Sequence, residues 1–152
     1  EVDIDENGVT FRVALLDGQK TGHFFDQADN RAWAALRCAG LDVLDLYANG
    51  GGWGLAALRA GARSVLAVDR SVLCCEQIGV NASLNGAAER VEVSREDGKQ
   101  ALLRLQAEGR RFGAVVLDMV PEQLRQQAEA AGVDVRAVAE TVRSLTIRAR
   151  KN

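Results

Sequence analysis

The sequence is poor in the residues that small proteins use as covalent or metal cross-links. Its 152 residues include three cysteines, one histidine and one proline. Cys38, Cys74 and Cys75 show no metal-ligand spacing, and a single histidine cannot complete such a set. We therefore expect neither a metal site nor a disulfide framework. Cys74 and Cys75 are interpreted as buried structural thiols on a helix.

Long apolar runs are also missing. The longest, VALL and AVVL, are far too short to cross a bilayer. The acidic start EVDIDENG lacks the basic and apolar regions of a signal peptide. We therefore expect no membrane association and a cytoplasmic location.

Strong charge of one sign is absent as well. The net charge is −2, which gives no whole-molecule argument for nucleic-acid binding. Two short segments are basic, GRR at 109–111 and RARK at 148–151. They are interpreted as a solvated turn and a solvated terminus in preference to a phosphate-binding patch.

What the sequence does contain is the pattern of a single α/β domain. Hydrophobic residues make up 47% and charged residues 26%, which is ordinary for a globular protein of this length. Apolar residues alternate with polar ones over residues 2–15, and Asn7-Gly8 in between predicts a β-hairpin. Asp29 or Asn30 is expected to cap a helix over 31–39.

From residue 42 onward, strands and helices alternate. Glycine, serine and asparagine mark their ends, with Ser71 as the cap of one helix. This order predicts a parallel sheet with helices on both faces. The expected strands are 42–47, 64–69, 91–94 and 113–118, and the expected helices are 53–60, 72–84 and 99–108. Helices at about 122–131 and 134–145 are expected to form a helical C-terminal tail.

The turn after the first of these strands is rich in glycine. Backbone N–H groups of such a turn hold a nucleotide-like ligand, and Asp69 at the end of the next strand is placed to accept both ribose hydroxyls. A dinucleotide fingerprint fits weakly, since its third glycine falls on Leu55 or Ala57. Acids at three successive strands, Asp45, Asp69 and Asp97, favour S-adenosylmethionine over a nicotinamide cofactor.

Longer motifs narrow the interpretation. GQKTGHFFDQADNR, VLDLYANGGGWGLAALRAGARSVLAVDRS, NASLNG and VSREDGKQALLRLQAEGRRF occur in this order between about residues 5 and 118. Together they resemble the ribosomal large-subunit RNA cytosine-5 methyltransferases, class I S-adenosylmethionine enzymes that usually carry an N-terminal PUA domain. The resemblance implies a Rossmann-like class I methyltransferase sheet, S-adenosyl-L-methionine as cofactor and ribosomal RNA as partner.

The resemblance also implies roles for residues. Lys20 and Thr21 fall in the segment that closes over the cofactor, and Asp118 stands where the family's Asp-Pro-Pro approaches the target base, so Asp118 is the catalytic candidate. The expected cofactor-binding residues are Lys20, Thr21, Asp45, Tyr47, Gly51, Gly52, Asp69, Arg70, Asp97 and Gly98.

The sequence departs from the family pattern at several positions. Ala28 replaces an arginine after DQ, Gly113 replaces an acid, and Met119-Val120 follow Asp118 in place of two prolines. No cysteine follows Cys75, although the family adds a downstream thiolate to C6 of cytosine so that C5 can accept a methyl group. These departures point to a chain whose catalytic end is truncated or diverged.

Three functional readings stay open from the sequence. The first is cofactor binding within this RNA-modifying family, and the second is methyl transfer to an oxygen or nitrogen acceptor, with Asp118 or His23 as base. The third is a non-catalytic S-adenosylmethionine-binding or oligomerisation module, with a homodimer through the C-terminal helices. The expected divisions are 1–30 for the hairpin and closing segment, 31–120 for the cofactor-binding core and 121–152 for the tail. Residues 135, 138, 142 and 145 would form the dimer face.

Overall fold

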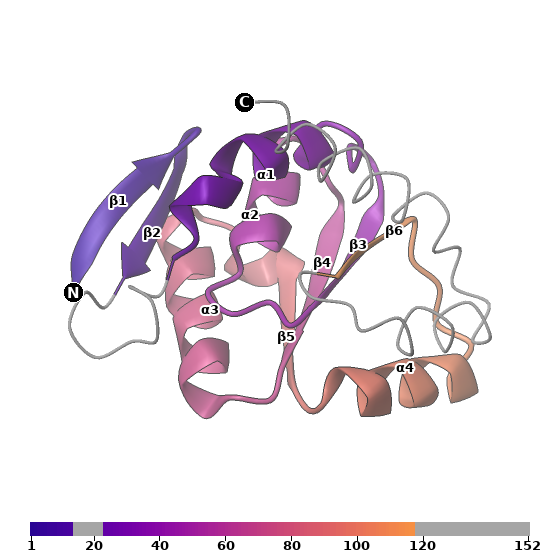
Figure 1. Cartoon of the computed structure of the whole chain (residues 1–152). Coiled ribbons are helices and arrows are strands. Elements are labelled where there is room, and N and C mark those ends of the chain that lie inside the picture. The colour runs from indigo at the N-terminus through magenta and orange to yellow at the C-terminus, as the bar shows by residue number, and fades with distance from the viewer. Residues whose placement is uncertain (14–22, 118–152) are drawn as a thin grey trace.

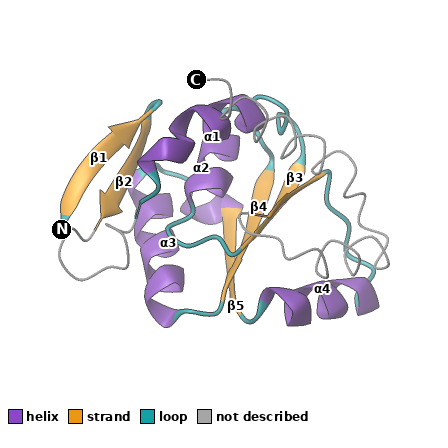
Figure 2. Cartoon of the chain, in the orientation of Figure 1, coloured by secondary structure: helices purple, strands orange, loops and turns teal. Residues whose placement is uncertain are grey.

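The computed structural model describes residues 1–13 and 23–117. Within them, an antiparallel hairpin precedes a four-stranded parallel sheet with helices on both faces, as predicted (Figures 1 and 2). The strands are β1 (Val2–Glu6), β2 (Val9–Val13), β3 (Asp42–Leu46), β4 (Ser64–Asp69), β5 (Val91–Arg95) and β6 (Ala114–Leu117). The α-helices are α1 (Ala28–Ala35), α2 (Gly52–Arg59), α3 (Val72–Leu84) and α4 (Gly98–Ala107), and two 3-10 turns are η2 (Phe25–Gln27) and η3 (Ala88–Arg90). The predicted C-terminal helices lie outside the described residues.

The order of the strands in the sheet is β5-β4-β3-β6. The chain moves outward from β3 through β4 to β5, then returns to place β6 on the other side of β3. The direction therefore reverses at β3, and in open α/β sheets ligands bind in the crevice outside the carboxyl ends of the strands at such a point. This edge of the sheet is where the glycine turn lies.

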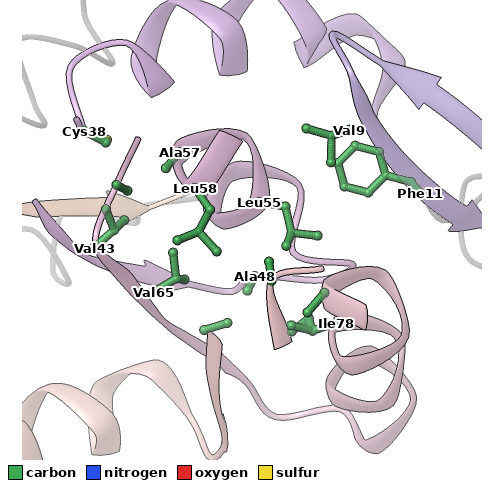
Figure 3. Packing of buried hydrophobic residues seen from close by; sticks show 14 of the residues in the cluster. Val9, Phe11, Cys38, Val43, Ala48, Leu55, Ala57, Leu58, Val65 and Ile78 are labelled. Atoms are coloured by element: carbon green, nitrogen blue, oxygen red, sulfur yellow. The ribbon is translucent and has the colours of Figure 1, made fainter. Parts of the chain in front are cut away.

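Alternate residues of each strand enter two separate cores. Val43, Val65 and Ala67 face α2, α3 and the hairpin, which supplies Val9 and Phe11 (Figure 3). The intervening residues face α4 on the opposite side of the sheet, where the cluster comprises Leu44, Leu46, Leu66, Val68, Ala101, Leu102, Leu105, Val115 and Leu117. Both faces of β3 and β4 are thus buried, which is why these strands read as nearly continuous apolar runs.

The hairpin is attached to α3 by side-chain amides in addition to apolar packing. Asn81 Oδ1 accepts from the backbone N–H of Arg12 at 2.8 Å, and Asn85 Oδ1 accepts from that of Thr10 at 2.9 Å. Asn85 Nδ2 donates to the carbonyl of Thr10 at 2.7 Å, and Gln77 Nε2 donates to that of Arg12 at 2.7 Å. The outward backbone groups of β2 are therefore satisfied without a neighbouring strand.

Helix α1 departs from the sequence-based prediction. It was expected over 31–39 with Asp29 or Asn30 as cap, whereas it spans Ala28–Ala35 and both residues lie inside its first turn. Gln27 occupies the cap position without a side-chain hydrogen bond, because the 3-10 turn η2 leads directly into the helix. The cap prediction was therefore wrong, and the preceding turn supplies the start instead.

No helix among residues 1–13 and 23–117 is long and apolar enough to cross a membrane. The same ranges contain no cluster of histidine, cysteine, aspartate or glutamate side chains that could hold a metal ion.

Candidate cofactor site

The turn between β3 and α2 has an unusual backbone. Every second residue has a positive φ, with 61° at Tyr47, 49° at Asn49 and 80° at Gly51. A bulky aromatic residue in this region is uncommon and costs roughly 1–3 kcal/mol, which is maintained only where the surroundings enforce it. Here the surroundings include backbone hydrogen bonds from Ala48 to Val68 at 3.1 Å and from Gly51 to Ala48 at 2.7 Å. Gly51 then caps α2, so the N–H groups that begin this helix lie at the same edge.

Asp69 joins this turn to the start of α3. Its Oδ2 accepts from the backbone N–H of Asn49 at 3.0 Å, and its Oδ1 accepts from that of Ser71 at 2.9 Å. The carboxylate is thus fixed in the crevice between the ends of β3 and β4 and stays partly exposed. A fixed, accessible carboxylate beside a glycine turn matches the chemistry of ribose-hydroxyl recognition.

Asp97 and Gly98 begin α4 at the third strand end. Asp97 Oδ1 caps the helix by accepting from the N–H of Lys99 at 2.9 Å. A Cβ on Gly98 would lie 2.8 Å from Cζ of Tyr47, so only glycine lets this aromatic ring rest against the helix start. Burial, and then the negative charge of Asp97, raise the pKa of the Tyr47 phenol, while the nearby positive charge of Arg70 opposes them. Tyr47, Asp97, Gly98 and exposed Arg70 therefore surround one end of the crevice.

Asp45 lies behind the turn and not in the crevice. It is fully buried within β3, and its Oδ2 accepts from the N–H of Gly54 at 2.9 Å. A Cβ on Gly54 would lie 2.8 Å from Cγ1 of Val65 and 3.2 Å from Asp45 Oδ2. Gly54 is thus the glycine that brings α2 against the sheet. The dinucleotide fingerprint places its third glycine at Leu55 or Ala57, so the fingerprint did not single out Gly54.

A buried ion pair, not foreseen from the sequence, supports the turn from the side of α1. Arg31 Nε and Nη2 donate to the two carboxylate oxygens of Glu6 at 2.7 and 2.6 Å, and Nη2 also donates to the carbonyl of Phe24 at 2.9 Å. The stem of Arg31 packs against Gly52, where an added Cβ would lie 3.3 Å from Arg31 Cδ. The arginine therefore connects the hairpin, η2 and the glycine turn.

His23 belongs to the same cluster. Its Nε2 lies 2.8 Å from Glu6 Oε2, and only 7% of the residue is exposed. Burial raises the pKa of Glu6, but the hydrogen bonds from Arg31 and His23 outweigh it and leave that pKa below its usual value. This buried position against Glu6 indicates a packing role for His23 and gives no support to its use as a general base.

Asn81 makes a second connection that the sequence did not reveal. Besides binding Arg12, this buried residue donates from Nδ2 to the carbonyl of Gly50 at 2.9 Å. It therefore ties the hairpin and α3 to the glycine turn. A polar residue inside an apolar helix pattern was the available signal, because buried amides need fixed partners.

The cysteines flank the crevice without becoming nucleophiles. Cys74 Sγ lies 3.5 Å from Asn49 Oδ1, and Cys75 Sγ lies 3.4 Å from the carbonyl of Asp69. Burial raises the pKa of all three thiols, including Cys38. They are therefore protonated at neutral pH. Cys74 and Cys75 are half-buried, so the expectation that they are buried thiols is met only in part, whereas Cys38 is buried.

The structure describes most of the residues that were predicted to bind the cofactor, but not all of them. Gly51 and Gly52 form the turn itself, and Asp69, Tyr47, Arg70, Asp97 and Gly98 gather around the crevice. Lys20, Thr21 and Asp118 lie outside the described residues. The donor set that is described, with backbone N–H groups, one fixed carboxylate and an aromatic face, fits a nucleoside-containing cofactor.

Comparison with known proteins identifies the family. Residues 1–143 match the family model described as S-adenosylmethionine-dependent methyltransferase. The chain is 38% identical over 116 residues to the ribosomal RNA large subunit methyltransferase I of Shewanella denitrificans, covering 76% of this chain and 29% of that protein. It is 40% identical over 119 residues to the enzyme of the same name from Pseudoalteromonas atlantica, covering 78% and 30%. The chain thus spans less than a third of the length of these curated relatives.

Solved structures agree on the fold. A SAM-dependent methyltransferase from Streptococcus mutans superposes with a TM-score of 0.71 at 23% identity, covering 76% of this chain and 31% of that one. The tRNA m1G37 methyltransferase of M. jannaschii superposes with a TM-score of 0.64 at 15% identity, covering 82% and 38%. The predicted Rossmann-like fold is therefore confirmed, and so is the predicted cofactor class. With its family model matched over most of the sequence, the chain belongs to the S-adenosylmethionine-dependent methyltransferases.

Proposed function

We propose that this chain forms the S-adenosylmethionine-binding core of an RNA methyltransferase that acts on large-subunit ribosomal RNA, with cytosine C5 as the methyl acceptor. The observation that carries the proposal is the position of Asp69 at the carboxyl edge of the sheet, where Asn49 and Ser71 fix its carboxylate beside the glycine turn. Relatives 38% and 40% identical that are named for ribosomal RNA methylation support the substrate class.

Within this proposal each side chain around the crevice has a role. Asp69 accepts hydrogen bonds from the ribose hydroxyls, and Asp97 accepts from the adenine amino group. Tyr47 offers its ring to the adenine, while Gly51 and Gly52 let the ligand approach the backbone. Lys20, Thr21 and Arg70 complete the binding set, and Asp45 acts indirectly by holding α2 through Gly54. When bound, the cofactor supplies an electrophilic methyl group.

The proposal does not make this chain alone a complete catalyst. Addition of a thiolate to C6 is needed before C5 of cytosine accepts a methyl group, and the three thiols here all have raised pKa values. Asp118 keeps its role as the catalytic candidate beside the target base. In this proposal the described residues bind the cofactor, and the thiolate that adds to C6 of cytosine comes from outside the described residues.

Calorimetric titration with S-adenosylmethionine tests the cofactor site. Asp69→Asn should weaken binding roughly 10- to 100-fold, because a hydrogen bond to a charged group contributes about 1.5–3 kcal/mol. Asp42→Asn is the matched control, since Asp42 lies at the amino end of β3, away from the crevice. NAD should not bind. Equal affinity of both variants would remove the role assigned to Asp69. No binding by the wild-type chain would favour a non-catalytic interaction module.

A further inference from the structure

A concave site lies away from the proposed cofactor site. A cavity of about 350 Å³ opens between the hairpin turn, the last turn of α2 and the end of α3, and its walls include Gly8, Arg59, Asn85 and Arg90. Its apolar members are almost fully buried, with Leu55 at 3% exposed. Polar groups therefore form most of the surface that a ligand would meet.

The charge of this cavity is uncompensated. Arg59 and Arg90 both line it, and none of the lining residues is acidic. Five of the eleven arginines in the described ranges have carboxylate partners, namely Arg12, Arg31, Arg63, Arg104 and Arg110. In contrast, no ion pair joins Arg59 or Arg90 to any carboxylate within residues 1–13 and 23–117.

The neighbouring residues position these guanidinium groups and leave most of their N–H donors available for hydrogen bonds to a ligand. Gly8 has a φ of 77°, and a Cβ placed on it would lie 3.2 Å from Arg59 Nε, so the glycine turn of the hairpin makes room for this side chain. Among the residues that the structure describes, the hydrogen bond of Arg90 is a long one of 3.5 Å to the carbonyl of Ala62. Asn85 is fully engaged with Thr10 and Asn81, which fixes the wall between the two arginines.

We propose that Arg59 and Arg90 bind a phosphodiester of the RNA substrate in the cavity beneath the hairpin turn. This inference rests on the proposed function. Two forked guanidinium donors suit phosphate oxygens, and they offer little to a neutral ligand. Arg59 ends the helix that starts at the glycine turn, so the cavity lies about 10 Å from the cofactor crevice along α2. That distance corresponds to about three stacked nucleotides, so one RNA strand reaches both sites.

The test compares two double variants that remove the same charge. Arg59→Ala/Arg90→Ala empties the cavity of its cations, while Arg110→Ala/Arg111→Ala removes two arginines from the loop before β6, outside the cavity. Arg59 and Arg90 are both exposed, so their replacement should leave the urea midpoint of unfolding close to that of the wild type. Binding is measured by fluorescence anisotropy with a labelled RNA stem-loop that carries a single-stranded flank, at several salt concentrations.

We expect the cavity variant to bind this RNA about 25-fold more weakly, or about fivefold for each arginine. The slope of log affinity against log salt should fall by about 0.7, because both arginines contact one phosphodiester and each phosphate neutralised on a single strand contributes about 0.7. The loop variant should keep both values near those of the wild type. Equal losses in the two variants, no loss in the cavity variant or no RNA binding by the wild-type chain would overturn the proposal.

Two further measurements separate the possible failures. Titration with inorganic phosphate and with AMP reports small-anion binding, and tight binding of either, with RNA affinity unchanged in the cavity variant, would reassign the site to a free anion. S-adenosylmethionine affinity should be equal in both double variants. A wild-type chain that binds RNA through the cavity but fails to bind S-adenosylmethionine would retain this inference and contradict the proposed function.

Discussion

Replacing Gly54 by alanine should destabilise the protein, although the same change usually stabilises a helix. Alanine is favoured over glycine by about 1 kcal/mol in a helix interior. At Gly54, however, the new Cβ would lie 2.8 Å from Cγ1 of Val65, against an optimum of about 3.5–4.0 Å between carbon atoms. Val65 is only 2% exposed and β-branched, so it has little freedom to move. Overpacking of this kind costs about 1–3 kcal/mol.

Taking a cost near the upper part of that range, the net expectation for Gly54→Ala is a loss of about 1–2 kcal/mol. Gly79→Ala is the matched control, because Gly79 lies inside α3 with nothing within 4 Å of its would-be Cβ. This variant should gain about 0.5–1 kcal/mol. Urea unfolding of the two variants beside the wild type should therefore separate them by roughly 1.5–3 kcal/mol. A gain in stability for Gly54→Ala equal to that of Gly79→Ala would refute the close-packing argument.

Two more predictions concern charged groups. Arg31→Lys should lower the free energy of unfolding by roughly 3 kcal/mol, because lysine cannot reproduce the paired hydrogen bonds to buried Glu6. The measurement is thermal unfolding. The control is Arg63→Lys in an exposed ion pair, which should show little change. Hydrogen bonds from Arg63 and Ser64 lower the pKa of Asp42 from its usual value of 3.8 to about 2. The ionised carboxylate therefore contributes its full stabilisation above pH 3.8 and loses it as the pH falls toward 2. Asp42→Asn should flatten the dependence of the unfolding free energy on pH in this range, and an unchanged slope would contradict the lowered pKa.

The sequence predicted the central elements closely because strong local signals surround them. β4 and α3 have the expected bounds, and Ser71 caps α3 by accepting from the N–H of Cys74 at 3.4 Å. Apolar periodicity, a serine cap and the Asn85-Gly86 stop all agree there, so local and tertiary preferences coincide. β3 ends one residue earlier than expected, because Tyr47 has a positive φ, and β5 ends one residue later.

The candidate site was only partly predictable, because its supports are long-range. The acids at the strand ends follow from topology, since parallel strands deliver their carboxyl ends to one edge. Arg31 and Glu6 look like surface charges in the sequence, and only the folded chain brings residues so far apart into one buried pair. Gly54 was overlooked because its requirement comes from Val65 on the neighbouring strand and not from the turn.

The amides that attach the hairpin to α3 also determine how this small sheet can grow. Gln77, Asn81 and Asn85 are spaced four residues apart, about 6 Å along a helix, while Thr10 and Arg12 are two residues apart, about 6.8 Å along a strand. The near match lets one helix face imitate the edge of a strand. The outer edge of β2 is consequently closed to strand addition and to edge-to-edge aggregation. Any further strand that joins the hairpin sheet must pair with β1.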